Sequence, residues 1–198
     1  MLAPTFGVFL VLAGAEAEAQ RLAFGKCPNH PAMKDFDIQK FEGTWYEVER
    51  SFYLLEIASS CTKLDIAPVE RRPATLNIII KTVNRWTGGP SVSLGTATLK
   101  SNKTAVLDFR MSSRLPTAVA RMLPGAGVYH LLHTDYDSFA VLWSCSDLGF
   151  MHADLIWVLG RQQDLPVWAR AEVYNRLAEL NIDSDRLTLS RNKDCPNF

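Results

Sequence analysis

The sequence predicts an all-β protein with one flanking α-helix, in which eight strands form an up-and-down antiparallel β-barrel. Two observations support this prediction. Short runs of strand-forming residues recur at regular spacing and are separated by clusters of turn residues. One amphipathic stretch with helical spacing follows the last of these runs. Eight strands joined mostly by short turns favour a barrel over a sandwich.

The expected strands follow a leader that contains proline and runs from Cys27 to Pro31. They lie near Gly43–Arg50, Cys61–Ala67, Thr75–Asn84, Ser91–Leu99, Thr104–Met111, Gly127–Thr134, Phe139–Cys145 and Ala153–Arg161. Turn-forming residues separate several of them, at 68–73, 87–90, 101–103 and 135–138.

The helix is expected over Pro166–Asn181, because proline suits a first turn and apolar residues then recur at helical spacing. The apolar stripe comprises Val167, Ala171, Tyr174, Leu177 and Ala178. One such helix after eight strands is expected to pack this stripe on the outside of the barrel. A short ninth strand is expected over Leu187–Ser190.

The composition is that of one globular domain without repeats or linkers. The chain has 198 residues, of which 47% are hydrophobic and 21% charged, so neither a disordered nor a polytopic membrane protein fits. The formal net charge is 0, which argues against a nucleic-acid partner because such proteins usually present a basic face.

Residues 1–19 are interpreted as a signal peptide, which leaves residues 20–198 as the mature domain. A short apolar run, Thr5–Ala13, precedes the small-residue pattern Ala17-Glu18-Ala19, which is typical of a cleavage site. The protein is therefore expected to be secreted. Cleavage would expose Gln20, which can cyclise to pyroglutamate.

Four cysteines remain in the mature chain: Cys27, Cys61, Cys145 and Cys195. Their wide spacing excludes the short pairs typical of zinc sites and redox motifs. In a secreted chain they predict two disulfides, and spacing alone leaves three pairings open. Asn102-Lys103-Thr104 is the one glycosylation sequon, so Asn102 is expected to carry a glycan.

Three short motifs on these elements resemble those of the lipocalin family. Gly43-Thr44-Trp45-Tyr46-Glu47 opens the first strand, Thr134-Asp135-Tyr136 forms the sixth turn and Arg161 ends the eighth strand. Cys27-Pro28-Asn29, Ser144-Cys145 and Cys195-Pro196 extend the resemblance to the members typified by apolipoprotein D and Lazarillo. The resemblance implies an open calyx and the disulfides Cys27–Cys145 and Cys61–Cys195.

All three motifs fall at the same end of an up-and-down barrel, so their residues are interpreted as closing it and not as catalytic. Trp45 is expected to plug this end beneath the Arg161 guanidinium, a cation–π contact. The barrel-closing set is Gly43, Trp45, Thr134, Asp135, Tyr136 and Arg161.

Alternation along the strands predicts which side chains line the interior. Arg161 faces inward at the closed end, so residues at even steps before it share its face, and similar parity arguments apply to the other strands. The expected cavity lining is Ile78, Ile80, Leu107, Phe109, Met111, Ala140, Leu142, Leu155 and Trp157. Such a lining predicts a carrier of a fatty acid, sterol or similar lipid, because each buried methylene contributes about 0.8 kcal/mol.

The odd-numbered loops ring the opposite end, the mouth, and are unusually apolar. They carry Phe52, Leu54, Leu55, Trp86, Leu115, Val119, Met122, Leu123 and Phe150. The fifth loop, 112–126, is about ten residues longer than in apolipoprotein D by the resemblance and has an apolar helical stripe. The hypothesis is that the mouth docks on a lipoprotein or membrane surface; a lid or a neutral loop are the alternatives.

Other functions are less well supported by the residues. A tetrapyrrole carrier, bilin or haem, is the main alternative, because a mouth histidine can ligate iron; however, His130 and His133 are expected on opposite faces of one strand, and His152 stands apart. No hydrolase motif occurs, so no enzymatic activity, cofactor or metal is expected. Since Ser146 and Asp147 follow Cys145, no disulfide to a partner protein is predicted.

Overall fold

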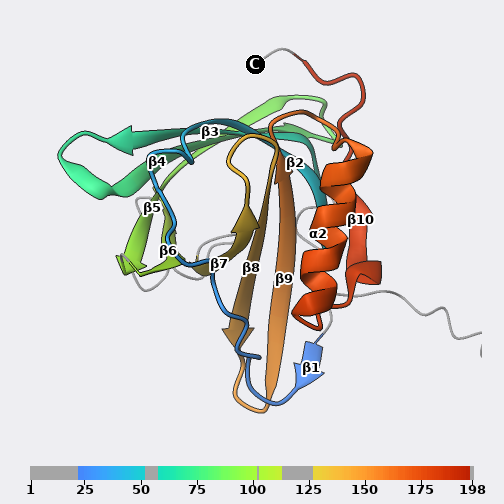
Figure 1. Cartoon of the computed structure of the whole chain (residues 1–198). Helices are drawn as coiled ribbons and strands as arrows, with labels where there is room; N and C mark the ends of the chain where they lie inside the picture. Colours follow the sequence, from blue (N-terminus) through green and yellow to red (C-terminus); the bar gives the residue numbers. More distant parts are fainter. Residues whose placement is uncertain (1–21, 52–57, 102, 113–126, 197–198) are drawn as a thin grey trace, which may run out of the picture.

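The computed structural model describes residues 22–51, 58–101, 103–112 and 127–196. Eight of its strands form the barrel (Figure 1). They are β2 (Gly43–Ser51), β3 (Ser59–Val69), β4 (Arg72–Asn84), β5 (Pro90–Ser101), β6 (Thr104–Met111), β7 (Gly127–Thr134), β8 (Phe139–Asp147) and β9 (Met151–Gly160). The predicted strands agree with these bounds to within a few residues, and the predicted fold class is confirmed.

The strands pair in chain order, each antiparallel to the next, and β2 pairs with β9 to close the sheet. β2 has a register shift between Glu47 and Glu49. Its first half pairs with β3 as far as Tyr46 opposite Lys63. Beyond that point, the edge of β2 that faces β3 pairs instead with β10 (Leu187–Leu189), a short strand from the C-terminal segment. The ninth strand predicted over Leu187–Ser190 is thus confirmed.

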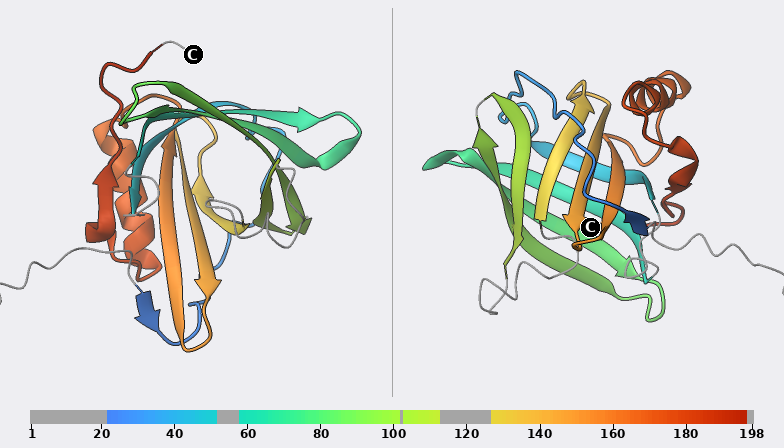
Figure 2. Two further views of the ribbon diagram at one scale, coloured as in Figure 1. Left: turned by 180° about the vertical axis from the view of Figure 1, so that it is seen from behind. Right: turned by 90° about the horizontal axis from the view of Figure 1, so that it is seen from below.

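Three further elements lie outside the barrel. The helix α2 (Val167–Glu179) matches the predicted helix and lies beside β9 and β10, with the 3₁₀ helix η2 (Ser184–Arg186) after it (Figures 1 and 2). The strand β1 (Leu22–Phe24) pairs with the start of β9 and was not predicted. Within the described ranges, no helix is long and apolar enough to cross a bilayer.

The predicted apolar stripe of α2 is wrong except at Leu177. The side chains that α2 buries against the outside of the barrel are Ala169, Val173 and Leu177, and Leu165 precedes them in the same cluster. Val167, Ala171, Tyr174 and Ala178 are exposed. Both sets recur at steps of three and four residues, so the spacing could not show which set meets the sheet.

Two disulfides fix the ends of the chain to the barrel. Cys27 pairs with Cys145 on β8, and Cys61 on β3 pairs with Cys195. All four cysteines are therefore bonded within the chain, and the pairing implied by the resemblance is confirmed. The first bridge holds the leader on the outer wall, and the second holds the C-terminal segment beside β3.

A buried ion pair lies on this outer wall, between β9 and η2. Both oxygens of the Asp154 carboxylate accept hydrogen bonds from the Arg186 guanidinium, at 2.8 and 3.0 Å, and Trp143 Nε1 donates to the same carboxylate at 3.1 Å. Burial alone would raise the pKa of Asp154, but the hydrogen bonds from Arg186 and Trp143 outweigh it and hold the pKa below its ordinary value.

This ion pair predicts a pH-dependent stability. Because the pKa of Asp154 is lower in the folded protein, its contribution is present above the ordinary pKa of about 4 and is lost as the pH falls through the folded value. Asp154→Asn should lower the free energy of unfolding by about 1–3 kcal/mol at pH 7, and by less at pH 3. Urea unfolding at the two pH values measures this; an equal loss at both would contradict the assignment.

Candidate functional site

The closed end of the barrel is plugged by Trp45, the third residue of β2. Its side chain is fully buried, and its indole Nε1 donates to the Phe41 carbonyl at 3.0 Å. The rings of Trp45 and Phe41 lie 5.0 Å apart between centroids. The segment before β2 therefore folds across this end and covers the plug.

Arg161 fixes the plug from the opposite side. Its guanidinium carbon lies 3.8 Å from the centroid of the Trp45 ring, and it donates to the carbonyls of Tyr136 at 2.9 Å and Thr44 at 3.0 Å. Gly43 has a φ of +99°, and a Cβ there would lie 3.0 Å from Arg161 Nη1. Glycine is therefore needed both for the backbone and for the space.

The turn between β7 and β8 completes this end. Thr134 Oγ1 donates to the Phe139 carbonyl at 2.6 Å, and Asp135 Oδ1 accepts from the backbone N–H groups of Ser138 and Phe139. The turn presents the Tyr136 carbonyl to Arg161. The six residues predicted to close the barrel are thus brought together at one end.

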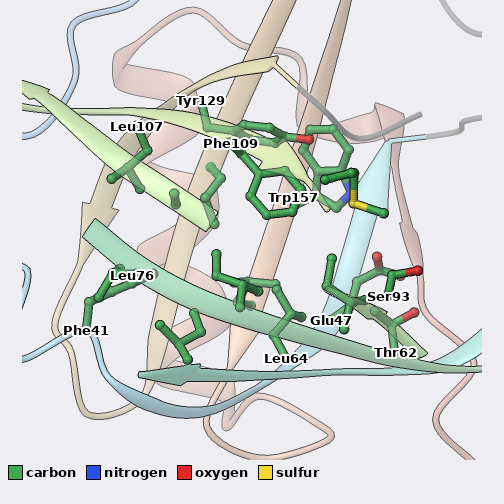
Figure 3. A pocket seen from close by; sticks show the side chains of 17 residues that line it. Phe41, Glu47, Thr62, Leu64, Leu76, Ser93, Leu107, Phe109, Tyr129 and Trp157 are labelled. Carbon is green, nitrogen blue, oxygen red and sulfur yellow. The ribbon is translucent and has the colours of Figure 1, made fainter. Parts of the chain in front are cut away.

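Above the plug lies a cavity of about 240 Å³, which is large enough for one small ligand. Figure 3 shows its lining, in which Phe41 and Leu76 lie on one side and Glu47, Thr62 and Ser93 on the other. The lining residues are Phe41, Glu47, Thr62, Leu64, Ile66, Leu76, Ile78, Ile80, Ser93, Ala97, Leu107, Phe109, Met111, Tyr129, Leu142, Trp157 and Leu159.

Seven of the nine side chains expected in the lining surround this cavity: Ile78, Ile80, Leu107, Phe109, Met111, Leu142 and Trp157. Ala140 is fully buried in the same core cluster as Trp45 and Leu131 and is not among the lining residues. Leu155 pairs with Ser144, further toward the mouth than Trp157, and is half-buried outside the lining.

The lining also contains residues that the sequence did not single out. Glu47 shares the face of Trp45 on β2, and Thr62, Leu64 and Ile66 alternate along β3. The alternation of side chains along each strand places these residues on the inner face. Glu47 and Thr62 were not singled out because they are polar, and the lining was expected to be apolar. Phe41 precedes β2 and had no such signal.

Comparison with known families identifies this architecture. The model of the lipocalin / cytosolic fatty-acid binding protein family matches residues 42–194. The chain belongs to this family.

Several relatives support the assignment. Apolipoprotein D of Cavia porcellus is 34% identical over 195 residues, which cover 95% of each chain. The Lazarillo protein of Schistocerca americana is 25% identical over 184 residues, covering 90% of this chain and 79% of the relative. Among solved structures, insecticyanin of Manduca sexta superposes with a TM-score of 0.74 at 18% identity, covering 89% of this chain and 91% of that one. The lipocalin fold is thereby confirmed.

The histidines of this lipocalin do not line the cavity. His130 Nδ1 lies 3.0 Å from the His30 carbonyl of the leader, His133 lies 4.0 Å from Glu172 of α2, and His152 Nδ1 lies 3.0 Å from the Gly25 carbonyl. The expectation of opposite faces for His130 and His133 is wrong, because a register shift between Leu131 and His133 changes the alternation. In the described residues, no cluster of three or more potential metal ligands occurs.

Two of the mouth residues expected from the sequence, Trp86 and Phe150, lie in the described part of the lipocalin mouth. Trp86 is 78% exposed in the turn between β4 and β5, which the Asn84 side chain holds by accepting from the Trp86 and Thr87 N–H groups. Phe150 is 75% exposed in the turn between β8 and β9. The other expected mouth residues are outside the described ranges: Phe52, Leu54, Leu55, Leu115, Val119, Met122 and Leu123.

One corner of the mouth is more apolar than the sequence indicated. β1 attaches beside the β8–β9 turn, where Gly25 N–H donates to the Phe150 carbonyl at 2.9 Å. This places the exposed Phe24 next to Phe150 and Leu148, which is also exposed. Three large apolar side chains therefore gather at this corner.

Proposed function

We propose that the protein is an extracellular carrier that holds one small apolar ligand, such as a fatty acid, a sterol or a similar lipid, in the barrel cavity. The observation that carries the proposal is the cavity itself, whose lining is apolar apart from a few polar side chains. At about 0.8 kcal/mol per buried methylene, a lipid chain reaches micromolar affinity without specific hydrogen bonds.

The pairing of the cysteines supports a carrier and not an enzyme. The lipocalin family, which the sequence resembles, includes a prostaglandin synthase that uses a free cysteine inside the barrel. Here all four cysteines are in disulfides, so no thiol is available for that chemistry. The haem or bilin alternative loses its support, because His130, His133 and His152 contact groups outside the cavity.

The two disulfides also support an extracellular location, since such bonds persist in oxidising compartments. The proposed signal peptide, residues 1–19, the new terminus at Gln20 and the glycan at Asn102 belong to the same proposal and lie outside the described residues. Peptide mapping of the secreted protein would locate the cleavage site and the glycan together.

The bound ligand is testable on protein purified from its own source. Native mass spectrometry should show a complex heavier than the polypeptide and its glycan by the mass of one lipid. Extraction with organic solvent should remove that mass and yield the lipid for identification. Protein that repeatedly yields no apolar compound in the extract would contradict the carrier function.

We further propose that the mouth exchanges the ligand with a lipoprotein or membrane surface. Trp86, Leu148 and Phe150 are exposed on loops at the open end, and the exposed Phe24 lies beside Leu148 and Phe150. Aromatic side chains are well suited to the interface between water and lipid. A docked mouth would let the ligand pass between cavity and lipid without crossing water.

Liposome flotation tests this docking. The double variant Trp86→Asp/Phe150→Asp should remain with the soluble fraction, whereas wild type floats with the liposomes. The matched control is Val167→Asp/Trp168→Asp, which changes two exposed apolar residues at the start of α2, away from the mouth, and should float as wild type does. Equal partitioning of the mouth variant and wild type would contradict docking.

A further inference from the structure

The polar groups of the cavity are not evenly distributed. Of the seventeen described residues that line it, Glu47 is the one acidic or basic side chain. Figure 3 shows it beside Thr62 and Ser93, with their oxygen atoms together, whereas Phe41 and Leu76 lie on the opposite side. An elongated ligand in this cavity therefore meets an apolar floor at one end and a carboxylate with two hydroxyl groups at the other.

Glu47 lies where β2 and β3 separate. Their pairing ends at Tyr46 opposite Lys63, so Glu47 and Thr62 are the next residues on the two strands. The C-terminal segment fills the gap from outside: Ser190 Oγ donates to Glu47 Oε1 at 2.7 Å, and Asn192 Nδ2 donates to the Glu47 carbonyl at 2.7 Å. These contacts hold the carboxylate in the wall, where Glu47 is 5% exposed.

One described cation, Arg50, pairs with this carboxylate from outside the described cavity lining. Arg50 Nη1 lies 3.6 Å from Glu47 Oε1. Among the described lining residues, Glu47 is therefore the charged side chain that a ligand head at this end of the cavity would meet. Like charges repel strongly where water is scarce, whereas a hydroxyl or ammonium head can donate a charge-assisted hydrogen bond to a carboxylate.

We propose that Glu47 makes the cavity select amphiphiles whose polar head is cationic or donates hydrogen bonds, such as sterols, long-chain alcohols and long-chain amines, over those that end in a carboxylate. The inference rests on the proposed function, because it requires that the cavity hold an apolar ligand. The tail lies toward Phe41 and Leu76, and the head lies among Glu47, Thr62 and Ser93.

Three ligands that share one tail and differ in the polar head show how the head alone affects affinity. Dodecylamine, dodecanol and dodecanoic acid are each used at pH 7.4 to displace the neutral fluorophore N-phenyl-1-naphthylamine from the full-length protein. The ratio of amine to acid affinity is the deciding quantity, since both heads are ionised and the tails are identical. In wild type the amine should bind about tenfold more tightly than the acid, or better.

Glu47→Gln should abolish this preference. It should lower the affinity for dodecylamine, raise the affinity for dodecanoic acid and change the affinity for dodecanol little. The matched control is Glu49→Gln, two residues further along β2, because the Glu49 carboxylate lies outside the cavity and accepts from the Tyr174 hydroxyl of α2 at 2.8 Å. This control should keep the wild-type order of affinities.

A wild-type protein that binds the acid as tightly as the amine would overturn the proposal, whether or not the variants fold. A preference that survives unchanged in folded Glu47→Gln would also overturn it. If wild type bound neither the fluorophore nor any of the three ligands, the result would instead contradict the carrier function. The two failures are therefore distinguishable.

Discussion

Replacing Cys61 and Cys195 together by alanine is expected to lower the free energy of unfolding by about 5 kcal/mol. The two residues are 134 positions apart, so their bridge removes a large loop entropy from the unfolded chain. Denaturant unfolding of oxidised wild type and of the double variant measures the difference. A loss below about 1 kcal/mol would contradict the entropic account.

The same change should disturb the cavity as well as the stability. The C-terminal segment, which the bridge anchors at Cys195, carries Ser190 and Asn192. Both residues donate hydrogen bonds to Glu47 in the cavity wall. The comparison variant is Cys27→Ala/Cys145→Ala, whose bridge spans 118 positions and should contribute a similar free energy. That bridge holds the leader on the outer wall, so its loss should leave the amine preference of the remaining folded protein unchanged.

Trp45→Ala is expected to cost about 3–5 kcal/mol of stability. The side chain is fully buried between Phe41 and Arg161, so its removal leaves a cavity beneath the ligand space. It also removes the ring that the Arg161 guanidinium covers at 3.8 Å. Thermal and denaturant unfolding should both show the loss.

The control for this change is Trp45→Phe. Phenylalanine keeps an aromatic face for Arg161 but removes the indole N–H that donates to the Phe41 carbonyl, so it should cost clearly less than alanine. Wild-type stability in Trp45→Ala would show that the closed end does not depend on the plug. The interpretation of the motif as structural would then be wrong.

The strands and the closed end were predictable because each had a local signal. Turn residues set the strand limits, and the motif of Trp45, Tyr136 and Arg161 depends on contacts that few other residue types can make. The resemblance supplied the disulfide pairing, for which spacing left three possibilities open. These features needed no knowledge of how the elements pack against one another.

The failures came where tertiary packing decides between equal local patterns. The helix carries two apolar stripes, and the sheet buries the one that contains Ala169 and Val173. β1 has three residues and no periodic pattern, and it pairs with β9 beside the Cys27–Cys145 bridge. Glu47 had the right parity for the cavity but the wrong polarity for an apolar pattern, so the residue proposed to select the ligand was passed over.

The central claim, that the cavity binds the ligand, is tested most directly by filling it. Ala97 lines the cavity on β5, whereas Leu94 is exposed on the outer face of the same strand. Titration of N-phenyl-1-naphthylamine should give micromolar affinity for wild type and for Leu94→Phe, and an affinity at least about tenfold weaker for Ala97→Phe. Unchanged affinity in folded Ala97→Phe would contradict binding inside the barrel.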